Sequence, residues 1–363
     1  MVKNITIVVG ARPNFMKAAA LVHAADKTDL HISLIHTGQH YDPYLSDAFL
    51  EGLALPKPDH HLLVGSGSHG KVTARCLERI EEVLQLHRPD LVIVVGDVNS
   101  TLAAALAAAK LQIPVGHVEA GLRSGDRGMP EEINRIVTDS ISSLLFVSEP
   151  SGITNLIREG HTKRSMHLVG NTMIDTLYKF LPVATAQLKA YKLGLPTNGY
   201  ALVTLHRPAN VDTKADLTRI VEALKCITLR MPVVFPMHPR TSASFGKHGF
   251  TSTLANISDL KLSDPLDYVD FISLMSTAKV VVTDSGGVQE ETTALSIPCI
   301  TMRENTERPI TLMEGTNRLV GNSVAKLAEA LDSITNATKK SPALWDGHAA
   351  ERIISVIEAI NEL

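Results

Sequence analysis

The chain has 363 residues, of which 44% are hydrophobic and 20% are charged, and its formal net charge is −3. This length predicts two or three domains that each bury a core, and it excludes a peptide or a disulfide-stabilised mini-scaffold. With 35 basic against 38 acidic residues, no global basic field exists to hold nucleic acid or an anionic membrane. Only 4% aromatic residues argue against a stacking surface for single strands.

The cysteines, Cys76, Cys226 and Cys299, lie far apart, which fits neither a disulfide framework nor a zinc site. The 15 histidines include no pair with helical zinc spacing beside a third plausible ligand. The first residues lack the order of parts of a signal peptide, and no apolar stretch reaches membrane-spanning length. We therefore expect a cytoplasmic protein without metal, cofactor or membrane partner.

Short β-branched runs alternate with helical stretches along the first half of the chain. Six strands are predicted there, at residues 5–9, 32–37, 91–95, 115–118, 144–147 and 168–169. Such alternation is typical of βαβ units in a parallel sheet.

The second half repeats this pattern after a connecting helical stretch at residues 176–198. Four further strands are predicted, at residues 200–205, 233–237, 280–283 and 299–302. Residues 345–363 read as a closing helix whose isoleucines share one stripe. The sequence thus predicts the α/β class with two similar halves.

Polar residues follow almost every predicted strand, where open parallel sheets bind their ligands. Asp284 to Gly287 ends a strand and opens a helix, so its backbone N–H groups suit an anion, although a plain helix start is the alternative. Cations near other strand ends suit a diphosphate, unless they are ordinary surface charges. These cations are Arg12, Lys17, His206, Arg207, Arg303 and Arg308.

Carboxylates also gather after strands of the first half. Asp97, Glu119, Glu131 and Glu132 are candidates for a base that removes a carbon-bound proton, and each is alternatively a helix cap or a surface acid. In the second half, one carboxylate of residues 289–291 caps its helix or binds a ribose diol, and spacing alone does not choose.

Residues 65–70 (GSGSHG) fit the three-glycine pattern of dinucleotide sites. The segment before them, residues 60–64, is a poor buried strand, so we favour a glycine-rich loop beside the active site over an NAD site.

Together these loops resemble the non-hydrolysing UDP-N-acetylglucosamine 2-epimerase family from residue 10 to about residue 321. The matching motifs are residues 10–17 (GARPNFMK), 37–40 (TGQH), 96–101 (GDVNST), 117–124 (HVEAGLRS), 129–135 (MPEEINR), 169–172 (VGNT), 205–208 (LHRP), 284–291 (DSGGVQEE) and 306–309 (TERP). The resemblance implies two Rossmann-like domains whose parallel sheets face a central cleft, as in glycosyltransferase-B proteins. We place them at residues 1–172 and 173–363, with the last helix crossing back to the first domain.

The resemblance also implies the site residues. The residues that hold the UDP-sugar are Arg12, Lys17, His206, Arg207, Ser285, Gly286, Gly287, Glu291 and Arg308, with Glu291 on the ribose hydroxyls. The catalytic residues are Asp97, Glu119, Glu131 and His206. The implied reaction removes the C2 proton, expels UDP to leave 2-acetamidoglucal, and re-adds UDP with protonation on the opposite face.

The sequence departs from the family's pattern at two places, one near the sugar and one at the activator site. Many family members carry Glu or Gln at Asn14 and Glu at Ala209, so contacts near the sugar differ. Residues 41–44 (YDPY) replace a Gln- and Arg-rich helix that binds an activating second UDP-sugar in several bacterial relatives.

We expect a homodimer that makes polysaccharide precursors. The rivals are a hydrolysing epimerase, an epimerase of a UDP-2,3-diacetamido sugar, a glycosyltransferase, and a UDP-sugar-binding protein without chemistry.

Overall fold

The structure is a computed structural model that describes residues 2–39, 50–334 and 341–360. The chain divides into two compact units. Unit 1 contains Met1–Thr176 and Ala343–Leu363, and unit 2 contains Leu177–Pro342. The C-terminal segment therefore belongs to the same unit as the N-terminal half.

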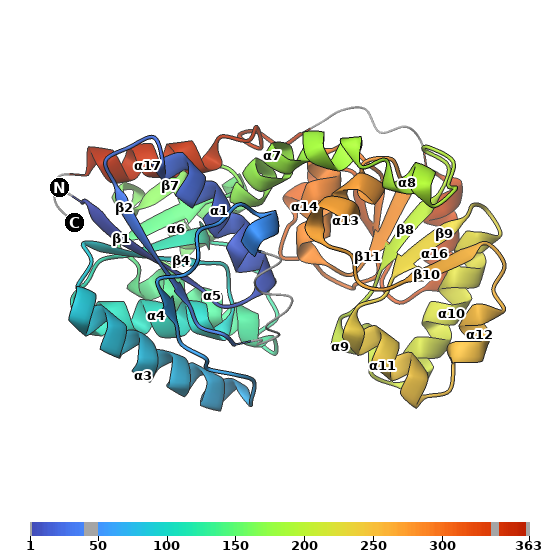
Figure 1. The fold of residues 1–363 in the computed structure, drawn as a ribbon, viewed down its shortest axis with the longest axis horizontal. Coiled ribbons are helices and arrows are strands. Elements are labelled where there is room, and N and C mark those ends of the chain that lie inside the picture. Colours follow the sequence, from blue (N-terminus) through green and yellow to red (C-terminus); the bar gives the residue numbers. More distant parts are fainter. Residues whose placement is uncertain (1, 40–49, 335–340, 361–363) are drawn as a thin grey trace. The chain divides into compact units, whose positions relative to one another are not determined.

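Unit 1 is built on a seven-stranded parallel sheet with the order β3-β2-β1-β4-β5-β6-β7 (Figure 1). Its strands are β1 (Asn4–Val9), β2 (His31–His36), β3 (His60–His61), β4 (Leu91–Val95), β5 (Val115–Ala120), β6 (Leu144–Val147) and β7 (Met166–Leu168). Its helices are α1 (Arg12–Ala25), α3 (His69–His87), α4 (Asn99–Lys110), α5 (Pro130–Ile141), α6 (Pro150–Arg158), the 3₁₀ turn η1 (Lys163–Ser165) and α17 (Ala349–Ala359).

Both faces of this sheet are covered, which explains why β4 is apolar throughout and fully buried. Val92 and Val94 point to the face covered by α3 and α4. Helix α1 packs on β1, β2 and β4 and lies beside α17, on the opposite side of the sheet in Figure 1. Helix α17 begins where Asp175 accepts hydrogen bonds from the backbone of Ala349 and Ala350, at 3.1 and 2.6 Å.

Unit 2 contains a six-stranded parallel sheet with the order β10-β9-β8-β11-β12-β13. Its strands are β8 (Ala201–Thr204), β9 (Val233–Pro236), β10 (Leu260–Ser263), β11 (Val280–Thr283), β12 (Cys299–Thr301) and β13 (Asn317–Leu319). Its helices are α8 (Lys189–Lys192), α9 (Pro208–Val211), α10 (Lys214–Thr228), α11 (Pro239–Lys247), α12 (Thr251–Ala255), α13 (Tyr268–Met275), α14 (Gly286–Ala294), α15 (Ile310–Met313) and α16 (Val324–Asp332). Helix α7 (Thr172–Ala186) contains the boundary between the units.

Each of the ten predicted strands overlaps an observed one, and the bounds of β4, β6 and β11 are as predicted. Strands β3, β10 and β13 were not predicted. All three are short edge strands, and none is buried throughout its length. They consequently lack the continuous apolar run that marks an internal parallel strand.

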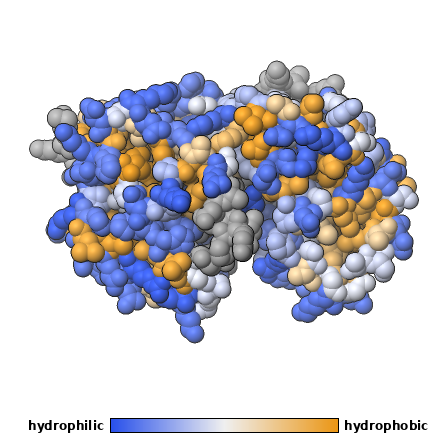
Figure 2. Space-filling model, viewed as in Figure 1, coloured by the Kyte–Doolittle hydropathy of each residue, from blue (hydrophilic) through white to orange (hydrophobic). Residues whose placement is uncertain are grey.

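The surface drawn in Figure 2 is largely hydrophilic, with apolar patches between the polar side chains. Among the described residues, no helix combines the length and apolar character needed to span a bilayer.

Candidate active site

Each sheet has a switch point, which is the pair of neighbouring strands from which the chain continues in opposite directions across the sheet. It lies between β1 and β4 in unit 1 and between β8 and β11 in unit 2. Ligands of open α/β sheets bind beyond the carboxyl ends of the strands at such points. In unit 1 this position is occupied by Gly10 and Gly96, and in unit 2 by Leu205 and Asp284.

Glu119 occupies an irregular position at the end of β5. The pairing of β5 with β6 shifts register between Val118 and Ala120, and Glu119 adopts a φ of 73°. Left-handed backbone is uncommon outside glycine and clusters at functional sites. The Glu119 side chain is 5% exposed, and its Oε2 forms an ion pair with the Nζ of Lys17 on α1.

Gly96, which follows β4, leaves space for this ion pair. Its φ is 70°, and a Cβ there would lie 3.4 Å from both Glu119 Oε2 and Lys17 Nζ. The segments that follow β1 and β4 and the end of β5 thus meet at the buried ion pair of Lys17 and Glu119.

Asp97 is held from helix α5. Its carboxylate forms an ion pair with Arg135, and its carbonyl accepts a hydrogen bond from Asn134 Nδ2 at 2.9 Å. Arg135 also contacts Glu132 at 2.6 Å. The Asp97 side chain stays 29% exposed, so Arg135 orients this carboxylate without removing it from solvent.

Glu132 acts as a structural acid in this arrangement. Its carboxylate accepts hydrogen bonds from the backbone of Ser124 at 3.0 Å and Gly125 at 2.9 Å. Burial opposes ionisation, but these bonds and Arg135 outweigh it, so the pKa of Glu132 lies below its ordinary value. Glu132 thus stabilises the loop before α5 and does not cap the helix, whose N-cap residue is Met129.

Glu131 differs from the other two predicted catalytic acids. It lies half-buried in the first turn of α5, and its side chain forms no hydrogen bond or ion pair within the described residues. Glu119 is buried against Lys17, and Asp97 is partly exposed beside Arg135. Unit 1 thus holds three carboxylates in three different electrostatic environments.

In unit 2, Asp284 organises the loop after β8. Its carboxylate accepts hydrogen bonds from the backbone of His206 at 3.0 Å, the backbone of Arg207 at 2.9 Å and the side chain of Asn210 at 2.9 Å. His206 Nδ1 lies 3.2 Å from the same carboxylate. Burial lowers the pKa of His206, and the facing Asp284 opposes that shift in part.

Ser285, the residue after Asp284, is the N-cap of helix α14, which begins at Gly286 and whose first turn has free backbone N–H groups. Gly286 is required there by close approach. A Cβ would lie 2.7 Å from Glu307 Oε1 and 3.1 Å from Arg308 Nη1. An anion at this terminus gains from backbone donors and from the helix dipole.

A buried group of charges lies against this helix. Glu307 contacts Arg303 at 2.8 Å and Arg308 at 2.7 Å, and Arg207 lies 3.7 Å away. Desolvation opposes ionisation of Glu307, but the surrounding guanidinium groups hold its pKa far below the ordinary value. Burial and the neighbouring Arg303 lower the pKa of Arg207.

Glu291 lies on α14 and is buried, with 3% of its surface exposed. Tyr268 donates a hydrogen bond to its Oε1 at 2.9 Å. Burial, with a smaller contribution from Glu290, raises the pKa of Glu291 to about 8. Glu291 is therefore mainly a neutral carboxylic acid at pH 7, able both to donate and to accept hydrogen bonds.

Glu291 should make stability depend on pH. Between pH 5 and 8 the native state retains a proton that the unfolded chain has released, so the unfolding free energy falls by about 1.4 kcal/mol per pH unit. Above pH 8 this dependence ends. Because Glu291→Gln removes it, the Tm of the variant minus that of the wild type should rise from pH 5 to pH 8. Glu222→Gln, at an exposed position of α10, is the control, and a constant Tm difference for Glu291→Gln would contradict the assignment.

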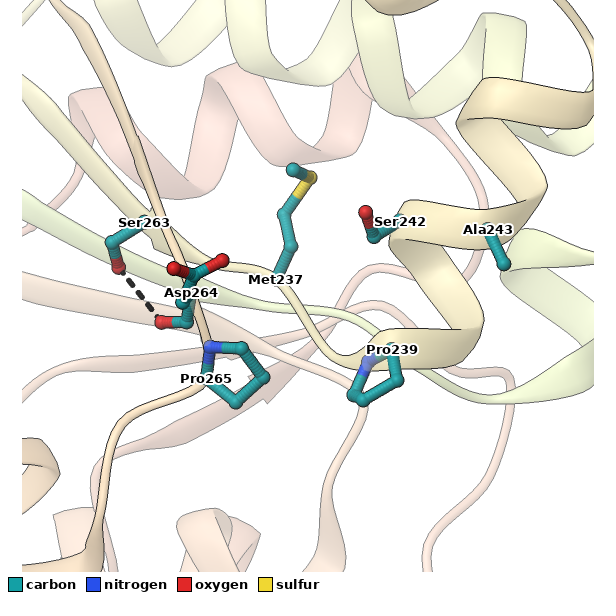
Figure 3. A pocket seen from close by; sticks show the side chains of 7 residues that line it. All are labelled: Met237, Pro239, Ser242, Ala243, Ser263, Asp264 and Pro265. Atoms are coloured by element: carbon teal, nitrogen blue, oxygen red, sulfur yellow. Dashed lines mark hydrogen bonds between the residues drawn. The ribbon is translucent and has the colours of Figure 1, made fainter.

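A pocket of about 420 Å³ opens beyond the carboxyl ends of β9 and β10. Met237 extends between the Ser263 and Asp264 side and Ser242 of α11, with Pro239 and Pro265 below it (Figure 3). His238, next to Met237, places its ring 5.3 Å from the ring of His206. The pocket therefore adjoins the polar loop after β8.

The predicted binding residues fall in contrasting positions. Arg12 is exposed in the first turn of α1, whereas Lys17 is buried on Glu119. Arg308 is buried and contacts Glu290 at 2.6 Å as well as Glu307. Ser285 and Gly287 are partly exposed at the start of α14.

Sequence reasoning missed the residues that hold these groups. The sequence marked Arg135 only as part of a motif and Asp284 only as a strand end. In the structure, Arg135 positions Asp97 and Asp284 positions His206. The spacing of Glu132 and Arg135 by three on a helix was a usable signal for an ion pair. No comparable signal pairs Asp284 with His206 across 78 residues.

Several other expectations concern this region. Residues 65–70 follow the two-residue edge strand β3, so they lack the buried strand of a dinucleotide site. His69 of this loop contacts Asn99, the first residue of α4, at 3.2 Å. His40 and residues 41–44 lie outside the described residues. Within residues 2–39, 50–334 and 341–360, no three His, Cys, Asp or Glu side chains form a metal-binding group.

Comparison with known proteins extends these observations over the whole chain. A family profile described as UDP-N-acetylglucosamine 2-epimerase matches residues 23–358. The UDP-N-acetylglucosamine 2-epimerase of Methanocaldococcus jannaschii is 41% identical over 361 residues, with 98% of each chain covered. The UDP-2,3-diacetamido-2,3-dideoxy-D-glucuronate 2-epimerase of Pseudomonas aeruginosa is also 41% identical, covering 96% of this chain and 98% of the relative.

Solved structures are similar over the same length. The M. jannaschii enzyme in complex with UDP-GlcNAc and UDP gives a TM-score of 0.90 at 40% identity, covering 98% of this chain and 99% of that one. The Neisseria meningitidis enzyme bound to UDP-GlcNAc gives 0.87 at 27% identity, covering 98% and 100%.

The two Rossmann-like parallel sheets define a glycosyltransferase-B-like protein of the α/β class, as expected. The similarity over the full length of the chain points to one family within that class. The chain belongs to the UDP-N-acetylglucosamine 2-epimerase family.

Proposed function

We propose that the protein is an isomerase that interconverts UDP-N-acetylglucosamine and UDP-N-acetylmannosamine without net hydrolysis. The main support for this proposal is a set of three carboxylates that follow β4 and β5, namely Asp97, Glu119 and Glu131. The relatives of the chain include proteins named UDP-N-acetylglucosamine 2-epimerase.

The residues of unit 2 suit the nucleotide. The first turn of α14 offers N–H groups to a phosphate, with Arg207 and the partly exposed His206 beside it. Glu291, farther along the same helix, takes the ribose hydroxyls, as the resemblance to the family implies. The pocket beside His238 receives the uracil ring.

The chemistry is an elimination followed by a re-addition. A carboxylate removes the C2 proton, the bond from C1 to the UDP oxygen breaks, and a C1–C2 double bond forms in 2-acetamidoglucal. UDP then re-adds at C1 while a proton returns to the opposite face of C2. The weakly acidic C2 proton requires a positioned base, and the departing diphosphate requires cations and N–H donors. Asp97, Glu119 and Glu131 supply the base and the acid, with His206 beside the leaving group.

The domains are residues 1–172 and 173–363, with the last helix returning to the first. Arg12 and Lys17 complete the diphosphate site from the first domain. The enzyme is a cytoplasmic homodimer that supplies precursors of polysaccharides.

Proton NMR with UDP-N-acetylglucosamine in D₂O tests the proposal. Deuterium entering C2, together with the anomeric signal of UDP-N-acetylmannosamine, is the expected result. Free N-acetylmannosamine would show a hydrolysing enzyme instead. No exchange at C2 would contradict the proposed substrate.

The Pseudomonas relative supports a second substrate to be tested in parallel. Its identity to this chain equals that of the M. jannaschii enzyme, and its name specifies a diacetamido uronic acid. Ala209, where many family members have Glu, removes a negative charge beside Arg207. Faster exchange with the UDP-2,3-diacetamido uronic acid than with UDP-N-acetylglucosamine would favour this substrate.

A further inference from the structure

The backbone on both sides of Glu119 is bridged by a single buried carboxylate. Asp139 Oδ1 lies 2.6 Å from Nδ1 of His117, and Asp139 Oδ2 accepts a hydrogen bond from the backbone N–H of Gly121 at 3.0 Å. His117 is two residues before Glu119, and Gly121 is two residues after it. Asp139 therefore spans the bulge that places Glu119 at a φ of 73°.

The second nitrogen of His117 reaches another loop of the site. Its Nε2 lies 2.8 Å from the carbonyl oxygen of Gly96, the residue before Asp97. The two ring nitrogens of His117 thus each face an oxygen atom, one on the Asp139 carboxylate and one on the Gly96 backbone. This ring is completely buried.

Asp139 is suited to this bridge because it is held as an anion. Burial opposes its ionisation, but His117 and Arg123, whose Nη2 lies 2.7 Å away, lower its pKa below the ordinary value. Arg123 is anchored in turn by Glu159 at 2.6 Å. Both Asp139 oxygens are thereby committed to fixed donors.

The bridge also connects the third acid. Asp139 and Glu131 lie on the same helix, α5, eight residues apart, so a rigid element joins them. One network accordingly touches the β4 loop that carries Asp97, both flanks of Glu119 and the helix that carries Glu131.

We propose that His117 and Asp139 are positioning residues of the epimerase reaction, which hold Glu119 in its left-handed conformation and align it with Asp97. This inference rests on the proposed function. Left-handed backbone is unfavourable for glutamate, so the surrounding structure must impose it. A displacement of about 1 Å at a reacting group lowers turnover by on the order of 100-fold.

Three variants test the bridge. Asp139→Ala removes both contacts of the bridge, the one with His117 and the one with the backbone of Gly121. Asp139→Asn keeps them, because the amide donates to a neutral His117 and its oxygen accepts from Gly121. Asp90→Ala is the matched control, since Asp90 also accepts two backbone N–H groups, from Lys3 and Asn4, but beside the opposite ends of β1 and β4. If Asp139→Ala does not fold, Asp139→Ser, which retains one of these contacts at most, replaces it.

The expected results separate positioning from stability. Asp139→Ala should lower kcat by about 100-fold with KM within about threefold of the wild type, and Asp139→Asn should restore kcat to within about tenfold. Asp90→Ala should lower Tm and leave kcat unchanged. A crystal structure of Asp139→Ala should show Glu119 at negative φ.

Two results would overturn the inference. One is an Asp139→Ala enzyme whose kcat equals that of the wild type. The other is a crystal structure in which Glu119 keeps a φ near 73° without the bridge. A wild-type enzyme that exchanges no proton at C2 would instead contradict the proposed function, and the φ of Glu119 would still decide whether the bridge imposes the backbone.

Discussion

Asp97→Asn is expected to lower kcat for epimerisation by roughly 100- to 10,000-fold, which is the contribution of a positioned acid or base. The amide cannot take up a proton, yet its oxygen can still accept from Arg135, so the loop after β4 should keep its conformation. The dissociation constant of UDP, measured by calorimetry, should stay within about threefold of the wild type. Loss of turnover with binding intact would identify Asp97 as a catalytic group.

Asp126→Asn provides the matched control for this substitution. Asp126 is an exposed acid on the loop before α5, and its Oδ1 accepts from the backbone of Gly128 at 2.9 Å, a bond that asparagine can also make. Its kcat should equal that of the wild type. Full turnover by Asp97→Asn would remove Asp97 from the mechanism and leave the chemistry to Glu119 and Glu131.

Gly286→Ala is expected to weaken UDP binding by roughly 10- to 100-fold, the equivalent of about 1.4 to 2.7 kcal/mol. The new Cβ would lie 2.7 Å from Glu307 Oε1. Glu307 cannot easily withdraw, because Arg303 and Arg308 hold it at 2.8 and 2.7 Å inside the protein. Either the charges separate or the start of α14 shifts, and both changes disturb the N–H groups that face the phosphate.

Calorimetry with UDP measures this effect, and Gly246→Ala on α11 is its control. Nothing lies within 4 Å of the Cβ that alanine would add at residue 246. That variant should bind UDP as the wild type does and gain up to about 1 kcal/mol of stability from helix propensity. Unchanged UDP affinity in Gly286→Ala would show that the diphosphate lies elsewhere.

Much of the fold was readable because internal parallel strands are buried on both faces. The runs at residues 91–95 and 280–282 are continuously apolar and buried, as expected for internal parallel strands. Edge strands such as β10 have no fully buried residue and carry polar residues like Lys261, so the same criterion fails for them. The polar residues after internal strands were then found by their position alone, since a parallel sheet gathers its strand ends at one edge.

The amino-acid sequence by itself determined the α/β class, the internal strands and the residue types at their carboxyl ends, because these depend on local apolar runs and on chain order. Only the tertiary structure decided which charges meet. Lys17 pairs with Glu119 across 102 residues, and Asp284 holds His206 across 78, distances at which spacing carries no signal. The left-handed backbone of Glu119 and the raised pKa of Glu291 likewise arise from the surrounding packing, since burial and neighbouring donors set both.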